Sequence, residues 1–182
     1  VCDDYSGYKA RFKSGDVIEV GCMAHARRKF HELHVTGKSQ IAEQALVLIQ
    51  KLYAIEAELR KKTDSTAEHR REYRQQHSQP VRQQLYEWLN QHDLTVPSSS
   101  PTAKAINYSL KRWPALSRYL DDGNLPIDNN WAENSMRPWA LGRKNWLFAG
   151  SLRSGQRAAN IMTLIQSAKL NGLDPYAYLS DV

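Results

Sequence analysis

Three carboxylates in this sequence have surroundings that suit metal chemistry. Asp3 and Asp4 lie in "CDDYSGY", at the end of a predicted strand, and Glu133 lies in "IDNNWAENSMR". No other acid follows Glu133 until Asp174. Carboxylates that converge from separate elements offer hard oxygen ligands, which suit Mg²⁺ or Mn²⁺. Two such ions about 4 Å apart can activate a nucleophile and stabilise the leaving oxygen in phosphoryl transfer.

Each of these acids also has a purely structural interpretation. Asn130 as an N-cap and Glu133 at the third helical position match a capping box, and a negative charge there suits the helix dipole. Asp3 and Asp4 could instead form a polar turn. Capping and ligation are compatible, because a residue in the first turn of a helix has a well-defined direction. The sequence leaves both interpretations open.

The segment after Glu133 mixes cations with aromatic rings and reads "RPWALGRKNWLFAGSLRSGQR". Cations can neutralise phosphates, and aromatic rings can stack on exposed bases. We therefore predict a DNA-binding surface here, although a basic surface over a partly buried aromatic cluster is the alternative. The predicted DNA contacts, two of them nearer the start of the chain, are Arg27, Arg28, Arg137, Arg143, Lys144, Trp146, Arg153 and Arg157.

The stretch "CMAHARRKFHELH" places Cys22 and His25 three positions apart. A structural zinc site would need a second pair of ligands, which is missing. The "HELH" motif differs from that of zinc proteases, whose histidines are four positions apart rather than three. Three interpretations remain, namely a buried cysteine beside surface histidines, a basic helix that faces DNA, and a metal site.

Charge and composition favour a polyanionic partner. The 182 residues carry a formal net charge of +6, and the sequence pI is near 9.3, so nucleic acid is the first expectation and a membrane surface the second. No apolar run approaches the roughly 20 residues of a membrane span, and no signal peptide is visible. The two cysteines do not make a disulfide framework, which favours a reducing cytoplasm. Since the sequence starts at Val1 and almost at once with a motif, we expect a piece of a longer protein.

The elements expected from patterning are a small β structure followed by helices. Residues 1–22 look extended, with a hairpin turn at Lys13–Asp16. A helix should start near Met23, and apolar residues at three- and four-residue spacing predict an amphipathic helix over 41–59. Residues 61–79 are polar and charged, which predicts a solvated helix end and a linker.

Proline and glycine divide the second half of the chain. Pro80 is expected to begin a new helix, and Pro114 should kink a helix over 102–120 because it removes a backbone donor. A further helix is expected between Ser154 and Gly172. Asp174 and Pro175 then form the cap and first turn of a short terminal helix.

The motifs quoted above, taken together, carry a family resemblance. "CDDYSGY", "VGCMAHARRKF" and "IDNNWAENSMRPWALGRKNWLFAGS" resemble the insertion-sequence-66 family of bacterial transposases, and "SAKLNGLDPYAYL" fits the same family further on. The match covers nearly the whole chain in the expected order. The segment that contains Glu133 is highly specific.

The resemblance implies a DDE transposase, whose three carboxylates hold two Mg²⁺ or Mn²⁺ ions. Such enzymes hydrolyse a DNA strand at the element end and then use the freed 3′-hydroxyl to attack target DNA. The implied fold is α+β and mostly helical, a partial RNase H-like core with a large helical insertion. The core would take residues 1–37 and 123–182, and the insertion would take 38–122.

Family positions carry over to particular residues. Asp3 matches the second aspartate, in the pattern Asp-Gly-Tyr-x-Gly-Tyr, and Glu133 matches the third acid. Both are expected to be catalytic and to bind metal. Asp4 replaces the usual glycine, so the resemblance leaves either aspartate as the ligand. Cys22 and His25 resemble the Cys-x-x-His signature found between these acids in several DDE families.

The resemblance also implies what this chain lacks. The family's first aspartate belongs to an upstream strand, so we predict that this chain alone is catalytically inactive. The expected partners are the DNA of the element ends and of the target, together with further copies of the protein in an active complex in the bacterial cytoplasm, and no membrane. The alternative is a basic, helical DNA-binding remnant without chemistry.

Overall fold

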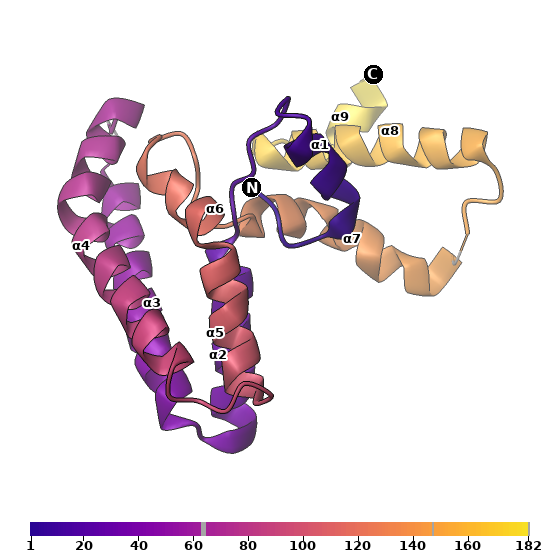
Figure 1. Cartoon of the computed structure of the whole chain (residues 1–182). Helices are drawn as coiled ribbons and strands as arrows, with labels where there is room; N and C mark the ends of the chain where they lie inside the picture. Colours follow the sequence, from indigo (N-terminus) through magenta and orange to yellow (C-terminus); the bar gives the residue numbers. More distant parts are fainter. Residues whose placement is uncertain (63–64, 147, 182) are drawn as a thin grey trace. The chain divides into compact units, whose positions relative to one another are not determined.

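The computed structural model describes residues 1–62, 65–146 and 148–181, and the side chains of all of these except 143–146. The chain divides into two compact units, Val1–Asn129 and Asn130–Val182. Every regular element in the described residues is a helix (Figure 1). The division predicted at residues 37/38 and 122/123 stays a prediction.

The predicted α+β fold with a partial RNase H-like core is wrong for this chain. Within the described residues, extended backbone pairs at one isolated parallel bridge, between Cys2 and Gly21. The expected hairpin is replaced by a 3₁₀ turn, η1 (Ser6–Tyr8), and a short helix, α1 (Lys9–Lys13). A strand needs a ladder partner for its backbone groups. Without one, the segment satisfies these groups locally as helix.

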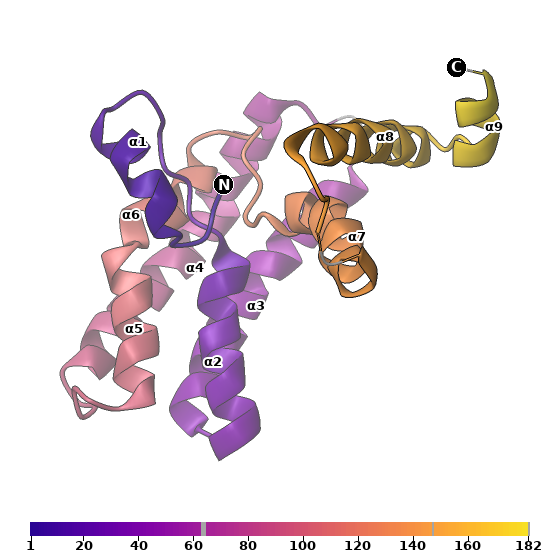
Figure 2. The same ribbon diagram turned by 90° about the vertical axis from the view of Figure 1, so that its right-hand side faces the viewer.

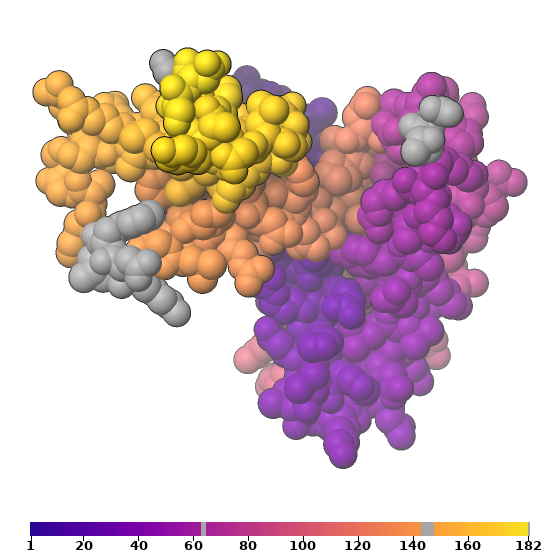
Figure 3. Space-filling model, turned by 180° about the vertical axis from the view of Figure 1, so that it is seen from behind, coloured from indigo at the N-terminus to yellow at the C-terminus, as the bar shows by residue number. Residues whose placement is uncertain are grey.

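Unit 1 is a set of packed helices. In chain order they are α2 (Met23–Gly37), α3 (Gln40–Lys61), α4 (Ala67–Asp93), α5 (Pro101–Lys111), α6 (Trp113–Ser117) and η2 (Arg118–Leu120). Helix α3 packs against α2 and α4, and α5 packs against the same two helices (Figures 1 and 2). Viewed from behind, α3 forms much of the surface of this unit (Figure 3).

The predicted helix start near Met23 and the predicted amphipathic helix over 41–59 are confirmed as α2 and α3. Three helices of unit 1 begin at a side-chain cap. Ser39, Thr66 and Ser100 accept a hydrogen bond from the backbone N–H three residues on, which starts α3, α4 and α5. The core joins side chains from all four long helices, among them Phe30, Ile49, Leu52, Leu89 and Ile106. Burial of each such side chain contributes about 1.5–3 kcal/mol.

The linker predicted over residues 61–79 is wrong, because most of it belongs to α4. That helix buries Arg74, Ser78, Leu85 and Leu89, which lie four, seven and four residues apart on one face. The first two are polar, so hydrophobic periodicity cannot detect the first half of the helix. Pro80 therefore lies inside α4 rather than at its start.

Pro114 breaks its predicted helix instead of kinking it. Helix α5 ends at Lys111, and α6 begins at Trp113, with Pro114 in its first turn. A proline is tolerated there because the first backbone N–H groups of a helix have no partner within it. The break places Arg112 at the joint between the two helices.

Gly123 is needed where the chain passes the start of α4. A Cβ atom at this position would lie 1.8 Å from the carbonyl oxygen of Ala67. The carbonyl of Gly123 also accepts a bond from Arg70 Nε at 2.8 Å. We predict that Gly123→Ala destabilises unit 1 by about 1–3 kcal/mol through overpacking against backbone. Urea unfolding followed by circular dichroism measures this, and Gly37→Ala, where a Cβ meets no atom within 4 Å, is the control.

Unit 2 consists of α7 (Asn130–Trp146), α8 (Leu152–Leu170) and α9 (Pro175–Asp181). Asp174 caps α9 as predicted, since its Oδ1 accepts the N–H of Ala177 at 2.8 Å. Large apolar side chains are exposed here, including Trp131 and Phe148. No helix in the described part of the chain is long and apolar enough to cross a membrane.

Candidate functional site

The backbone before Asp3 is bonded to the residues that lead into α2. Cys2 donates its N–H to the carbonyl of Val20 at 2.9 Å, and its own carbonyl accepts the N–H of Cys22 at 3.1 Å. Both backbone groups of Cys2 are therefore hydrogen-bonded. They hold the residue before Asp3 against the N-terminus of α2.

The last residues of unit 1 are held at the same point. Met23 donates its N–H to the carbonyl of Ile127 at 3.0 Å, and Asn129 donates its N–H to the Sγ of Cys22 at 3.4 Å. Tyr53, on α3, donates its hydroxyl to Asp128 at 2.9 Å. The start of α2 thus joins the segment before Asp3 to the segment that leads into α7.

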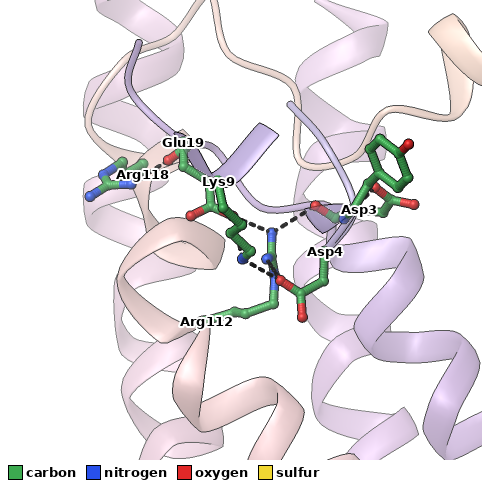
Figure 4. Close-up of polar contacts among 7 residues, drawn as sticks. Asp3, Asp4, Lys9, Glu19, Arg112 and Arg118 are labelled. Carbon is green, nitrogen blue, oxygen red and sulfur yellow. Dashed lines mark hydrogen bonds and ion pairs between the residues drawn. The ribbon is translucent and has the colours of Figure 1, made fainter. Parts of the chain in front are cut away.

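The two adjacent aspartates have different environments (Figure 4). The carboxylate of Asp4 forms ion pairs with Lys9 and with Arg112, the latter at 2.6 Å. The hydrogen bond from Lys9 lowers the pKa of Asp4 below its ordinary value, and Arg112 adds to this. The carboxylate of Asp3 accepts the backbone N–H of Tyr5 at 3.0 Å. Two cations thus pair with the carboxylate of Asp4, whereas no cation pairs with the carboxylate of Asp3 in the described residues.

Arg112 organises this part of the chain from the joint between α5 and α6. Its side chain is 5% exposed, and besides Asp4 it contacts the carbonyl of Asp3 at 3.2 Å and the carboxylate of Glu19 at 2.8 Å. Its guanidinium also lies 5.7 Å from the ring centroid of Tyr108. One arginine therefore ties the first four residues to the helical body of unit 1.

A pocket of about 340 Å³ lies beside Asp3. The first segment, α2 and α5 all contribute to it, and its lining residues are Asp3, Asp4, Tyr5, His25, Arg28, Lys29, Glu32 and Tyr108. Of the two predicted arginines on α2, Arg28 faces this pocket. Arg27 instead lines a separate groove against α3.

Cys22 is a buried thiol at the N-cap position of α2. Burial raises the pKa of its thiol, which disfavours the thiolate that a metal would need. Within the described residues, no three His, Cys, Asp or Glu side chains are grouped so that they could hold a metal ion. The burial of Cys22 agrees with one part of the first interpretation, a buried cysteine beside surface histidines, whereas His25 and His34 are half-buried. The choice among the three interpretations stays a prediction.

Glu133 is an exposed residue in the first turn of α7, as predicted. Asp3 belongs to unit 1 and Glu133 to unit 2, so their sharing of an ion stays a prediction. Arg137 on α7, and Arg153 and Arg157 on α8, are exposed. The side chains of the remaining predicted DNA contacts, Arg143, Lys144 and Trp146, lie outside the described residues.

Sequence reasoning missed Arg112 and Lys9, which distinguish the two aspartates. Arg112 lies 108 positions from Asp4, and neither cation belongs to a motif. The pattern around Arg112 predicts the middle of the helix expected over 102–120, not a joint between two helices. A signal for this contact exists only in the folded chain.

Comparison with known proteins identifies the family. The model described as "Transposase IS66 family" matches residues 1–157, and "IS66 C-terminal element" matches residues 163–182. This chain belongs to the IS66 transposase family. Membership confirms the resemblance drawn from the motifs.

Curated relatives of this IS66-family chain are uncharacterised proteins of Sinorhizobium fredii (strain NBRC 101917 / NGR234). The protein y4qI is 42% identical over 185 residues, which is 98% of this chain and 34% of the relative. The protein y4jD is 40% identical over 187 residues, which is 99% of this chain and 36% of the relative. The chain thus spans about a third of the length of these relatives. No solved structure matches it.

Proposed function

We propose that this chain supplies two ligands of a divalent-metal site in a transposase, Asp3 and Glu133, for DNA strand cleavage and strand transfer. The observation that carries the proposal is the junction at the start of α2. It holds the segment before Asp3 and the segment before α7 at one point of unit 1. A metal site built from two distant parts of a sequence needs such a joint.

The covalent chain allows the two carboxylates to meet. Glu133 follows Asn129 by four residues, and four residues span at most about 14 Å. Asn129 is bonded to Cys22, which is bonded in turn to Cys2. Both acids therefore have an anchor at the same junction, although they are 130 positions apart.

Asp3 fits a divalent cation better than Asp4 does. Two cations already neutralise Asp4, whereas no cation pairs with Asp3 in the described residues. Mg²⁺ prefers carboxylate oxygens and keeps several waters, so two protein carboxylates are a plausible part of its shell. The ion would act as a Lewis acid on the phosphoryl oxygen and lower the pKa of a bound water or hydroxyl. Asp3 and Glu133 would orient it, while nearby arginines hold the DNA.

Metal removal tests this function. The test uses a longer chain, in which this sequence replaces the matching third of a full-length relative. We predict that this longer chain transfers a labelled element end to target DNA in the presence of Mg²⁺ or Mn²⁺, and that EDTA stops the transfer. The 182-residue chain alone should show none, because two carboxylates are too few to hold the metal well. Transfer that persists in EDTA would contradict the proposal.

A second candidate function is DNA binding without chemistry. The exposed arginines on α2, α7 and α8 favour it, together with the formal net charge of +6. Mobility shifts of this chain across a salt series test it, because phosphate contacts weaken as salt rises. If the longer chain carries out strand transfer, the first function is supported, and DNA binding is one step of that reaction. Binding without any transfer would favour the second function.

A further inference from the structure

We infer that the pocket beside Asp3 binds one phosphodiester of a DNA strand end, with Arg28 and Lys29 holding the phosphate. This inference deepens the proposed function and rests on it. The pocket brings together groups from two separate motifs: an acid proposed to bind metal and an exposed aromatic ring from the first segment, and two adjacent cations from α2. Its volume of about 340 Å³ falls in the range of small-ligand sites.

The two cations present different kinds of contact. Lys29 lies over the ring of Tyr108, with its Nζ 4.5 Å from the ring centroid, so part of its side chain is placed by packing. Arg28 is exposed and forms no ion pair with any described residue. An arginine fork matches the geometry of two phosphate oxygens, while lysine acts as a compact charge. Together they can neutralise one phosphodiester.

The acids of the pocket make phosphate binding depend on a divalent cation. Asp4 is neutralised by Lys9 and Arg112, which leaves Asp3 and Glu32 as negative groups in the lining. An approaching phosphate is repelled by these two carboxylates and attracted by Arg28 and Lys29. A cation on Asp3 removes part of the repulsion. Because coupling between two ligands is reciprocal, phosphate should also strengthen metal binding.

Tyr5 supplies a surface for the base next to the phosphate. Its side chain lines the pocket and is 61% exposed. Its ring packs edge-on against that of Tyr8, with ring centroids 5.4 Å apart, which supports one side and leaves a face for stacking. Stacking on aromatic rings tolerates any base. The site therefore fits the end of a strand irrespective of its sequence.

Titration of a short oligothymidine with a 3′-hydroxyl into the 182-residue chain tests the inference. The probe is short so that it cannot span several basic surfaces, and binding is followed by NMR with and without Mg²⁺. We expect signals of the pocket residues to shift, and we expect Mg²⁺ to tighten binding once its concentration is high enough to occupy a site that this chain holds weakly. Arg28→Ala combined with Lys29→Ala should weaken binding about tenfold, and it should reduce the slope of log affinity against log salt by about 0.7, the value for one phosphate on a single strand.

The matched control is Arg60→Ala combined with Lys61→Ala, which removes the same charge from exposed positions at the end of α3. An equal loss in both double variants would overturn the inference, since only net charge would then matter. Asp3→Asn should abolish the effect of Mg²⁺ while Arg28 and Lys29 still contribute. If Mg²⁺ still tightens binding to the Asp3→Asn variant, the proposed metal role of Asp3 is wrong. The phosphate contact is judged separately, by the loss of affinity in the Arg28 and Lys29 double variant.

Discussion

Strand transfer by the longer chain should fall about a thousandfold when Glu133 is replaced by glutamine. The amide has nearly the shape of the carboxylate but lacks its charge, so it is a poor ligand for Mg²⁺. Loss of metal-based charge stabilisation worth about 4 kcal/mol corresponds to about a thousandfold in rate. Binding of DNA should change little, because Glu133 contributes no positive charge. Transfer of a labelled element end, with a mobility shift in parallel, measures both effects.

The adjacent aspartates give this prediction an internal control. Asp3→Asn should reduce transfer as strongly as Glu133→Gln, because it removes the second proposed ligand. Asp4→Asn should reduce it only a few-fold, since Asp4 pairs with Lys9 and Arg112 rather than with metal. Both variants remove one negative charge from neighbouring positions. If Asp4→Asn were the inactive one, the assignment of the ligand would be reversed.

The second large effect concerns stability, and it arises at the buried ion pair between α3 and α4. Arg74 donates from Nε and Nη2 to the two carboxylate oxygens of Glu56, each at 2.8 Å. Its Nη1 donates to the carbonyls of Tyr119, Asp122 and Leu125 at 2.8, 3.1 and 2.9 Å. The two charged side chains are 4% and 7% exposed. This arginine therefore satisfies one buried charge and three backbone groups.

Arg74→Met should destabilise unit 1 by about 3–5 kcal/mol, because it leaves Glu56 charged and buried without its partner. For a chain of this size the midpoint of thermal unfolding should fall by about 6–20 °C. Adding Glu56→Gln should recover part of the loss, since the remaining group is then neutral. The control is Arg71→Met on the same helix, where the ion pair with Glu68 is exposed and little change is expected. A similar loss from both single variants would contradict this interpretation.

The features predicted correctly are those encoded in local patterns. Apolar residues at helical spacing located the helix that became α3, and Asp174 followed by Pro175 located the cap of α9. Glu133 was placed in the first turn of a helix because polar residues and a capping pattern precede it. Such signals lie within a few residues of one another, so a single sequence contains them.

The features that were missed depend on contacts between distant parts of the chain. Helix α4 buries Arg74 and Ser78, and a buried polar face looks like a solvated one until its partner is known. The first residues were expected to form strands, but they have no neighbouring strand among the described residues. The difference between Asp3 and Asp4 comes from Arg112, which is distant in sequence and lies outside any motif.

The central claim is that Asp3 and Glu133 bind the same divalent ion, and anomalous scattering from Mn²⁺ tests it most directly. A crystal of the longer chain soaked in Mn²⁺ should show a peak with one oxygen of each carboxylate about 2.1 Å from it. The peak should disappear in the Glu133→Gln variant. A peak bound by only one of the two residues, or carboxylates that each pair with a separate cation of the protein, would contradict the account.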